Sequence, residues 1–247
     1  MISPLKKTVL FVLILTILLG LTACGKQDPG GEETPAPPAS AAPAEPTPNK
    51  YLNSFDDASL SLAKKYFDFD AYAENKGRAK ENRINSDVIT ATVDGVELTL
   101  GMPYADVLAA GFQPVDESSA EQKITKKNDK PIEFTSPEGL IVTLTFAGEK
   151  GKPVTDGVLY RISMNSKKYD NAAMLLLSGV SSDTDTMQSM IDTFGNKPSR
   201  IRTIAYEEGK MLSVTYREQA QPVYINFAVD PADESIYHIS IEGNVKP

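Results

Sequence analysis

Few residues in this chain of 247 residues have side chains that are typical of catalytic or metal sites. There is one cysteine, Cys24, and one histidine, His238. A single cysteine forms no disulfide within the chain, and together with one histidine it cannot supply a tetrahedral Cys/His metal site. The other candidates are carboxylates, which serve elsewhere as general acids, nucleophiles or metal ligands. The sequence around each candidate decides between these uses.

The segment before Cys24 has the three parts of an export signal. Lys6 and Lys7 precede an apolar run at 9–19, "VLFVLILTILL", and small residues follow it. An apolar run this short, with basic residues ahead and a small-residue site behind, is typical of a cleaved signal peptide. An uncleaved N-terminal membrane helix is the alternative interpretation.

The sequence Leu-Thr-Ala-Cys at Leu21–Cys24 resembles the lipobox of bacterial lipoproteins. The resemblance implies that residues 1–23 are removed and that the Cys24 thiol receives a diacylglyceryl group. It also implies acylation of the new amino terminus, for example with palmitate. One acyl chain binds a bilayer reversibly, whereas two anchor it stably at about 0.8 kcal/mol per buried CH₂. We therefore expect a protein anchored in the cell membrane by lipid and facing outside the cytoplasm.

The chain is acidic, with 33 Asp and Glu against 25 Lys and Arg and a net charge of −8. Removal of Lys6 and Lys7 with the signal would make the charge two units more negative. Nucleic-acid binding needs a basic face, so the balance argues against such a partner. It also disfavours adsorption on anionic lipid, which leaves membrane affinity to the acyl anchor.

Residues 25–50 predict a disordered tether. The segment is rich in proline and alanine and contains no aromatic or large aliphatic residue, so it cannot bury enough apolar surface to offset its ordering entropy. In a polyproline-type extension it would reach roughly 80 Å at most. Its expected role is to hold a folded domain away from the membrane.

Residues 51–87 predict one helix, at about 56–74, and then a polar loop. From residue 88 the sequence becomes rich in strand formers. Asp94-Gly95 joins two such runs and is a strong hairpin signal. A short helix then follows, with Pro103 in its first turn and Gly111 at its end. Further strands are predicted at 131–135, 140–147 and 158–164.

The second half of the chain repeats this order. Four pairs of segments match in sequence order: 142–147 with 223–228, 159–164 with 236–241, 111–114 with 195–198, and 97–102 with 175–180. Four matches in one order indicate a tandem duplication. The helix of the second unit is expected within 181–194, capped by Ser181 or Ser182, with Met187, Met190, Ile191 and Phe194 on its apolar face. The fold class is therefore α+β, a tandem repeat of helix-plus-antiparallel-sheet units.

His238 lies in a predicted strand, "SIYHISI". Regular alternation would place it on one face with Ile236 and Ser240, opposite Tyr237 and Ile239. A lone strand histidine is more often a packed or surface residue than a catalytic base. No catalytic role is therefore predicted for it.

The acidic clusters lack the spacing of a calcium loop. They are Asp68–Asp70, Asp183–Asp185 and Asp230–Glu234. Helix-start electrostatics explains the second cluster and a turn the third. Gly148–Pro153 lacks the spacing of a phosphate loop and is predicted to join two strands, while the basic run at Lys123–Lys130 is expected to be a solvated loop. We predict no catalytic residue, no metal site and no cofactor.

The run "LTLGMPYADVLAAGFQP" at 98–114 resembles the Gly-Met…Val…Gly-x-Pro signature of small lipoproteins of the SmpA/OmlA outer-membrane-assembly type. A tandem of such units is similar to the β-lactamase inhibitory proteins. Members of both groups act by protein contact and are not enzymes. The resemblance covers roughly 88–242 and implies a non-catalytic binding module, an adaptor, sensor or inhibitor, with a protein partner. This chain departs from both groups in lacking tryptophan, and its second helix lacks the Gly-Met start.

The predicted organisation is a signal peptide at 1–23, a lipidated cysteine and tether at 24–50, a helix and polar linker at 51–87, a first repeat at 88–164 and a second at 165–247. Two other functions stay open, an enzyme acting on cell wall or polysaccharide through paired carboxylates, and a structural surface spacer. Convergent carboxylates in a pocket would favour the enzyme. An apolar, aromatic-bearing concave sheet face would favour the binding module.

Overall fold

The computed structural model describes residues 51–74, 90–125, 130–165, 175–182, 184–218 and 222–243. These residues belong to one compact unit, Thr47–Pro247. The predicted signal, Cys24 and the predicted tether lie outside the described residues, as does the polar run after the first helix. In the part of the chain that is described, no helix is long and apolar enough to cross a membrane.

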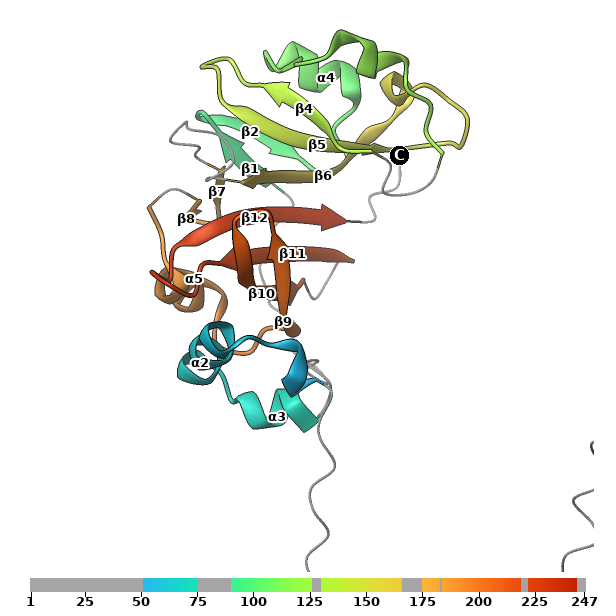
Figure 1. Ribbon diagram of the computed structural model, residues 1–247. Coiled ribbons are helices and arrows are strands. Elements are labelled where there is room, and N and C mark those ends of the chain that lie inside the picture. The colour runs from blue at the N-terminus through green and yellow to red at the C-terminus, as the bar shows by residue number, and fades with distance from the viewer. Residues whose placement is uncertain are drawn as a thin grey trace, which may run out of the picture. The chain divides into compact units, whose positions relative to one another are not determined.

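The larger sheet has eight antiparallel strands in the order β3-β4-β5-β6-β12-β11-β10-β9 (Figure 1). Their bounds are Gln113–Pro114 for β3, Ile132–Thr135 for β4, Ile141–Ala147 for β5, Val158–Asn165 for β6, Arg200–Tyr206 for β9, Gly209–Arg217 for β10, Val223–Val229 for β11 and Ile236–Gly243 for β12. Strands β6 and β12 pair in the middle, Ile162 opposite Ile241. The α+β class and the strands expected at 131–135, 140–147 and 158–164 are confirmed.

The smaller sheet has the order β2-β1-β7-β8, with β1 at Thr90–Val93, β2 at Val96–Thr99, β7 at Leu175–Leu177 and β8 at Val180–Ser181. The hairpin predicted at Asp94-Gly95 is confirmed, and both residues have positive φ, 54° and 74°. Ser178 and Gly179 turn β7 into β8 in the same conformation, at 53° and 88°. These φ values match the two-residue hairpin turn that favours Asp-Gly.

The region predicted as a single helix at 56–74 contains two helices, α2 at Asp57–Tyr66 and α3 at Phe69–Glu74, after a 3₁₀ turn, η1, at Leu52–Ser54. The helix breaks at Phe67, which has extended backbone. The break allows both Phe67 and Phe69 to enter the core. Asp68 then accepts a hydrogen bond from the Ala71 amide at the start of α3. The prediction of one helix was therefore wrong, because helical spacing cannot bury two aromatic side chains that are two residues apart on one face.

Helix α4 occupies Tyr104–Ala109, and Pro103, predicted in its first turn, is its N-cap. Ala110 is the C-cap, and Gly111, predicted as the cap, follows it with a φ of 96° and donates its amide to the Leu108 carbonyl. A 3₁₀ turn, η2, follows at Glu117–Glu121, and another, η3, at Val154–Asp156. The Tyr104 ring packs against Phe134 of β4 and Phe146 of β5, which fixes α4 on the sheet.

Helix α5 occupies Met187–Phe194 and begins later than predicted, with Thr186 and not Ser181 or Ser182 at its N-cap. Ser181 is instead part of β8, where its amide donates to the Asp185 carboxylate. The predicted apolar face is confirmed, since Met187, Met190 and Phe194 are buried and Ile191 packs beside them. The Phe194 ring lies against Tyr216 of β10 and Phe227 of β11.

One face of the larger sheet therefore forms the core. Its strands contribute buried apolar residues that pack in a single cluster with α2 to α5 and the smaller sheet: Phe134, Leu144, Ile162, Ile201, Val214, Ile225, Ile239 and Ile241 among others. At the sheet's outer end, α2 contacts β10, and the Tyr72 hydroxyl of α3 donates to the Pro198 carbonyl. The second face of the sheet is free to carry polar residues.

One of the four sequence matches is misaligned. Residues 97–102 hold the end of β2 and the turn before α4, whereas 175–180 hold β7, its turn and the start of β8. The predicted match between 97–102 and 175–180 therefore pairs segments of different structure and was wrong.

Candidate binding face

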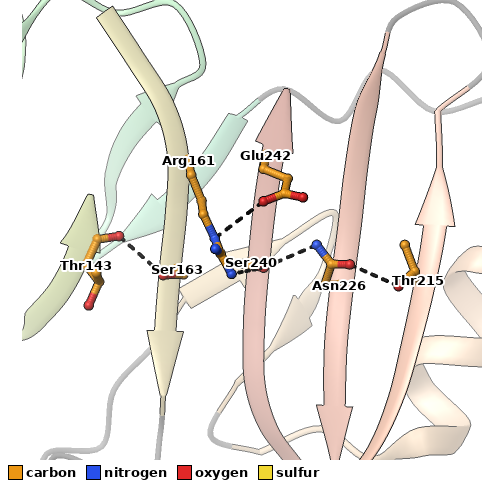
Figure 2. Close-up of polar contacts among 7 residues, drawn as sticks. All are labelled: Thr143, Arg161, Ser163, Thr215, Asn226, Ser240 and Glu242. Carbon is orange, nitrogen blue, oxygen red and sulfur yellow. Dashed lines mark hydrogen bonds and ion pairs between the residues drawn. The ribbon is translucent and has the colours of Figure 1, made fainter. Parts of the chain in front are cut away.

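The second face of the larger sheet carries rows of polar side chains and is called the open face below. Its central row crosses five strands at directly opposite positions: Thr143 of β5, Ser163 of β6, Ser240 of β12, Asn226 of β11 and Thr215 of β10. Figure 2 shows this row with the hydrogen bonds that link it. Directly opposite residues in an antiparallel sheet share a face, so strand pairing alone aligns them.

Hydrogen bonds run along the central row. Asn226 sits between two hydroxyls: it accepts from Thr215 Oγ1 at 2.9 Å and donates from Nδ2 to Ser240 Oγ at 3.5 Å. Ser163 Oγ donates to the Thr143 carbonyl at 3.5 Å. Arg161 Nη2 reaches Ser240 Oγ at 3.5 Å (Figure 2). The long contacts leave these groups capacity for a further partner.

A second row flanks the central one: Thr145, Arg161, Glu242, Tyr224 and Arg217. Arg161 Nε lies 3.7 Å from Glu242 Oε2, too far for a hydrogen bond. The Arg217 guanidinium lies 5.7 Å from the centre of the Tyr224 ring, a cation–π distance. This row therefore contains both positive and negative side chains.

A third row lies on the other side: Asn165, His238, Ala228, Ser213 and Arg202. His238 is partly buried and Ser213 fully so. This row places the only histidine of the chain beside the polar centre of the sheet. Sequence reasoning did not predict this environment, since it depends on the strand order.

Two bulges add tyrosines to the open face. The pairing of β5 with β6 skips Tyr160, and the pairing of β11 with β12 skips Tyr237. Tyr237 thereby joins Met211 and Ala228 in a small cluster on the open face, while Ile236 turns into the main core. The predicted grouping of His238 with Ile236 and opposite Tyr237 was therefore wrong, because an inserted residue reverses the alternation of a strand.

The tip of the β9–β10 hairpin, residues 206–209, reaches over the third row. The Tyr206 ring centre lies 4.8 Å from that of Tyr237 and 6.1 Å from that of His238. The Tyr237 hydroxyl donates to the Glu208 carboxylate and accepts from Asn165 Nδ2. Because β10 and β11 separate β9 from β12 in the sheet, these contacts require the edge of the sheet to curl inward. The tip forms one wall of a concavity.

The concavity consists of two adjoining hollows of about 170 and 280 Å³. Both are lined by Arg161, Tyr206 and His238. The smaller one adds Arg202, Ser213, Asn226, Ser240 and Glu242, and the larger one adds Thr143, Thr145, Tyr160, Ser163 and Asn165. Glu242 is the single carboxylate in these two linings. The hollows can thus offer hydrogen bonds and positive charge to a ligand.

The environment keeps His238 neutral. Burial and, to a smaller extent, the charge of Arg161 together lower the pKa of His238 to about 3. Burial raises the pKa of Tyr206, against the opposing effect of Arg161 and Arg202, and raises the pKa of Tyr237 to about 12 together with its hydrogen bond to Glu208. Near neutral pH the cations of the hollows are therefore Arg161 and Arg202.

The arginines of the described residues all lie on the open face. Arg161, Arg202 and Arg217 belong to the flanking rows, and Arg200 stands directly opposite Thr215. The chain as a whole carries a net charge of −8. A face with four guanidinium groups on so acidic a chain is a local reversal of charge. The spacing of two residues between Arg200 and Arg202 in a strand was a signal that sequence analysis missed.

The described residues of the acidic clusters have structural roles, and Asp183 lies outside the described part of the chain. Asp68 caps α3 and Asp185 binds the Ser181 amide. The third cluster forms the β11–β12 turn, where Glu234 accepts from Lys65 Nζ and the Tyr66 hydroxyl, both at 2.6 Å. Among the described residues no three His, Cys, Asp or Glu side chains gather as they would around a metal ion.

The two candidate loops differ in how far the structure describes them. The predicted turn at Gly148–Pro153 does join β5 to η3 and β6. Residues 126–129 of the basic run at Lys123–Lys130 lie outside the described part of the chain.

Comparison with known proteins finds no match: no protein family, curated protein or solved structure is detectably similar to this chain.

Proposed function

We propose that this chain is an exported, lipid-anchored binding protein whose open face contacts a protein partner outside the cytoplasm. The observation that carries the proposal is the concavity around Arg161, Tyr206 and His238 on a sheet whose other face is fully used as core. A rigid sheet with ordered polar rows presents donors and acceptors at fixed spacing, which favours recognition of a complementary surface.

The chemistry of the face favours binding over hydrolysis. Glycoside hydrolysis needs two carboxylates flanking the substrate, and the hollows contain one, Glu242, beside Arg161. An apolar, aromatic-bearing concave face would have favoured the binding module, but the residues that line the two hollows are mainly polar. Three tyrosines, Tyr160, Tyr206 and Tyr237, line it or pack within it.

The proposed anchor rests on the sequence. The lipobox-like Leu21–Cys24 and the proline-rich 25–50 would place the folded unit outside the cytoplasm, tethered to the membrane through Cys24. A tethered module of this kind searches for its partner at a high effective concentration near the membrane.

Site-specific photo-cross-linking in the producing cell tests the proposal. Tyr224 is on the open face, is 36% exposed, and can be replaced by a photoreactive phenylalanine of similar shape. Val115, 53% exposed and beside β3, provides the control position. We expect one discrete protein adduct from position 224 and none of that size from position 115. Absence of an adduct at 224, or equal adducts at both positions, would contradict the proposal.

We also infer that the two halves of the unit arose by duplication of one hairpin-helix-sheet segment. The order β1-β2-α4-β3-β4-β5-β6 has the counterpart β7-β8-α5-β9-β10-β11-β12. The turns at Asp94-Gly95 and Ser178-Gly179 share their backbone conformation. Each half also places a bulged tyrosine, Tyr160 or Tyr237, near the start of its last strand. These features support the inference independently of the misaligned match.

A further inference from the structure

Resting on the proposed function, we propose that the smaller hollow is a carboxylate-binding site that receives an acidic side chain of the polypeptide partner. Arg161 and Arg202, from β6 and β9, line it together with Ser240, Asn226 and Ser213. Guanidinium groups bind carboxylates with paired, charge-assisted hydrogen bonds. The hydroxyl and amide groups complete the set of donors.

The two arginines have hydrogen-bonding capacity to spare. Among the described residues Arg202 forms no ion pair, and its side chain is exposed. The Arg161 side chain is 39% exposed, and within the described part of the chain its guanidinium makes only a long hydrogen bond from Nη2 to Ser240 Oγ at 3.5 Å and a 3.7 Å ion pair from Nε to Glu242. An incoming carboxylate would complete bonds that the free protein leaves unmade, and such completion favours binding.

Charge complementarity identifies the occupant as acidic. The open face gathers Arg161, Arg200, Arg202 and Arg217 on a chain of net charge −8, so an acidic partner is attracted to this face and repelled elsewhere. Glu242 offsets part of the positive charge, so it would disfavour binding of a partner whose surface is only weakly acidic.

The aromatic side chains favour a polypeptide over an anionic polysaccharide. Sugar rings stack on exposed aromatic faces, but Tyr160 and Tyr237 of the concavity are buried at 8% and 0% exposure. Tyr206 packs against Tyr237 and His238. The exposed Tyr224 ring is covered on one side by Arg217. The surface therefore offers hydrogen bonds and charge rather than stacking platforms.

The test measures binding of fluorescent hexaglutamate to the full chain in non-ionic detergent, with hexaglutamine as the uncharged comparison. We expect hexaglutamate alone to bind, with affinity that falls as salt rises. The substitution Arg202→Gln should weaken binding about tenfold, since a charge-assisted hydrogen bond contributes on that scale. Lys210→Gln is the matched control, because Lys210 is exposed on the same hairpin and does not line the hollow. Equal weakening by both substitutions, or none by Arg202→Gln, would overturn the proposal.

His238 supplies a second readout inside the hollow. It is the only histidine, so its ring protons give isolated NMR signals. A carboxylate bound beside Arg161 should shift these signals and raise the pKa of His238, since a nearby negative charge favours the protonated ring. Unmoved signals at saturating hexaglutamate would place the binding elsewhere and overturn the site.

Oligogalacturonate, which carries carboxylates on a sugar backbone, tests the commitment to a polypeptide. Weaker binding than hexaglutamate is expected, and tighter binding would overturn the commitment in favour of a polysaccharide. Failure of hexaglutamate with a persisting adduct at position 224 would remove the carboxylate site and leave the proposed function standing. Loss of both hexaglutamate binding and the adduct at position 224 would contradict the carboxylate site and the proposed function together.

Discussion

At the scale of single residues, the arrangement around His238 depends on keeping its imidazole uncharged. Arg161 of β6 and Tyr206 and Arg202 of β9 line the same hollow as His238. Asn165 of β6 lies directly opposite His238 in the sheet. A protonated ring would lie near the Arg161 guanidinium, in a hollow that Arg202 also lines and that contains Glu242 as its single carboxylate. Burial and like charge therefore both favour the neutral form.

This arrangement predicts an acid-dependent loss of stability. The folded-state pKa of His238 is lowered from 6.5 to about 3. Between these pH values His238 is protonated in the unfolded chain and neutral in the folded chain. The free energy of unfolding should fall as pH drops from about 6.5 towards 3, and be insensitive to this group above 6.5. Urea titrations at several pH values should show a flatter dependence for His238→Gln than for the natural chain. Parallel curves would contradict the assignment.

The gathering of the arginines on one face of the sheet could not be predicted from the sequence alone. Arg161, Arg202 and Arg217 are scattered over 57 positions of the sequence and carry no motif. They share a face because of the order of strands β6, β9 and β10 in the sheet. Local patterning predicts which side of its own strand a residue takes but not which strands become neighbours.

At the scale of elements, local chemistry was a good guide where one short-range effect dominates. Asp94-Gly95 predicted its hairpin and Gly111 the end of α4, because each adopts positive φ. The bulges at Tyr160 and Tyr237 were not predictable, since an inserted residue leaves no signature in a run of strand formers. The break at Phe67 likewise reflects the core into which the helix packs.

The start of α2 gives an element-scale prediction. Asp56 is its N-cap, and its carboxylate accepts from the Ser59 amide at 2.8 Å. Asp56→Ala should lower the free energy of unfolding by about 1 kcal/mol. Asp57→Ala, one residue later and without the capping bond, should lower it by about half as much through the helix dipole alone. Chemical denaturation measures both, and equal losses would contradict the capping role.

At the scale of the whole molecule, the proposed function assigns attachment and recognition to different parts of the chain. Cys24 and the tether would hold the folded unit at the membrane, and the open face would bind the partner. The α5–β12 half and the α4–β6 half meet at the β6–β12 pair, which contributes Arg161, His238, Ser240 and Glu242 to the hollows. The proposed site therefore needs both halves, although neither half reveals it in its own sequence.

The proposed lipid anchor predicts that loss of Cys24 changes where the protein is found without changing its fold. Cys24→Ser removes the thiol that would receive the lipid, so the chain should no longer partition with membranes or incorporate labelled palmitate. Its open face is unaltered, and circular dichroism should match that of the natural chain. Membrane association that persists without the thiol would instead support the uncleaved helix at the N-terminus.

The most direct test of the central claim measures, in one experiment, partner contact at the open face and its dependence on the arginine-lined hollow. The photoreactive residue at Tyr224 is retained, and charge reversals are introduced separately as Arg202→Glu, inside the hollow, and Lys210→Glu, outside it on the same hairpin. The adduct yield in the producing cell is then compared. Recognition of an acidic partner through the open face predicts that Arg202→Glu abolishes the adduct and that Lys210→Glu preserves it. An adduct that survives Arg202→Glu at full yield would contradict the claim.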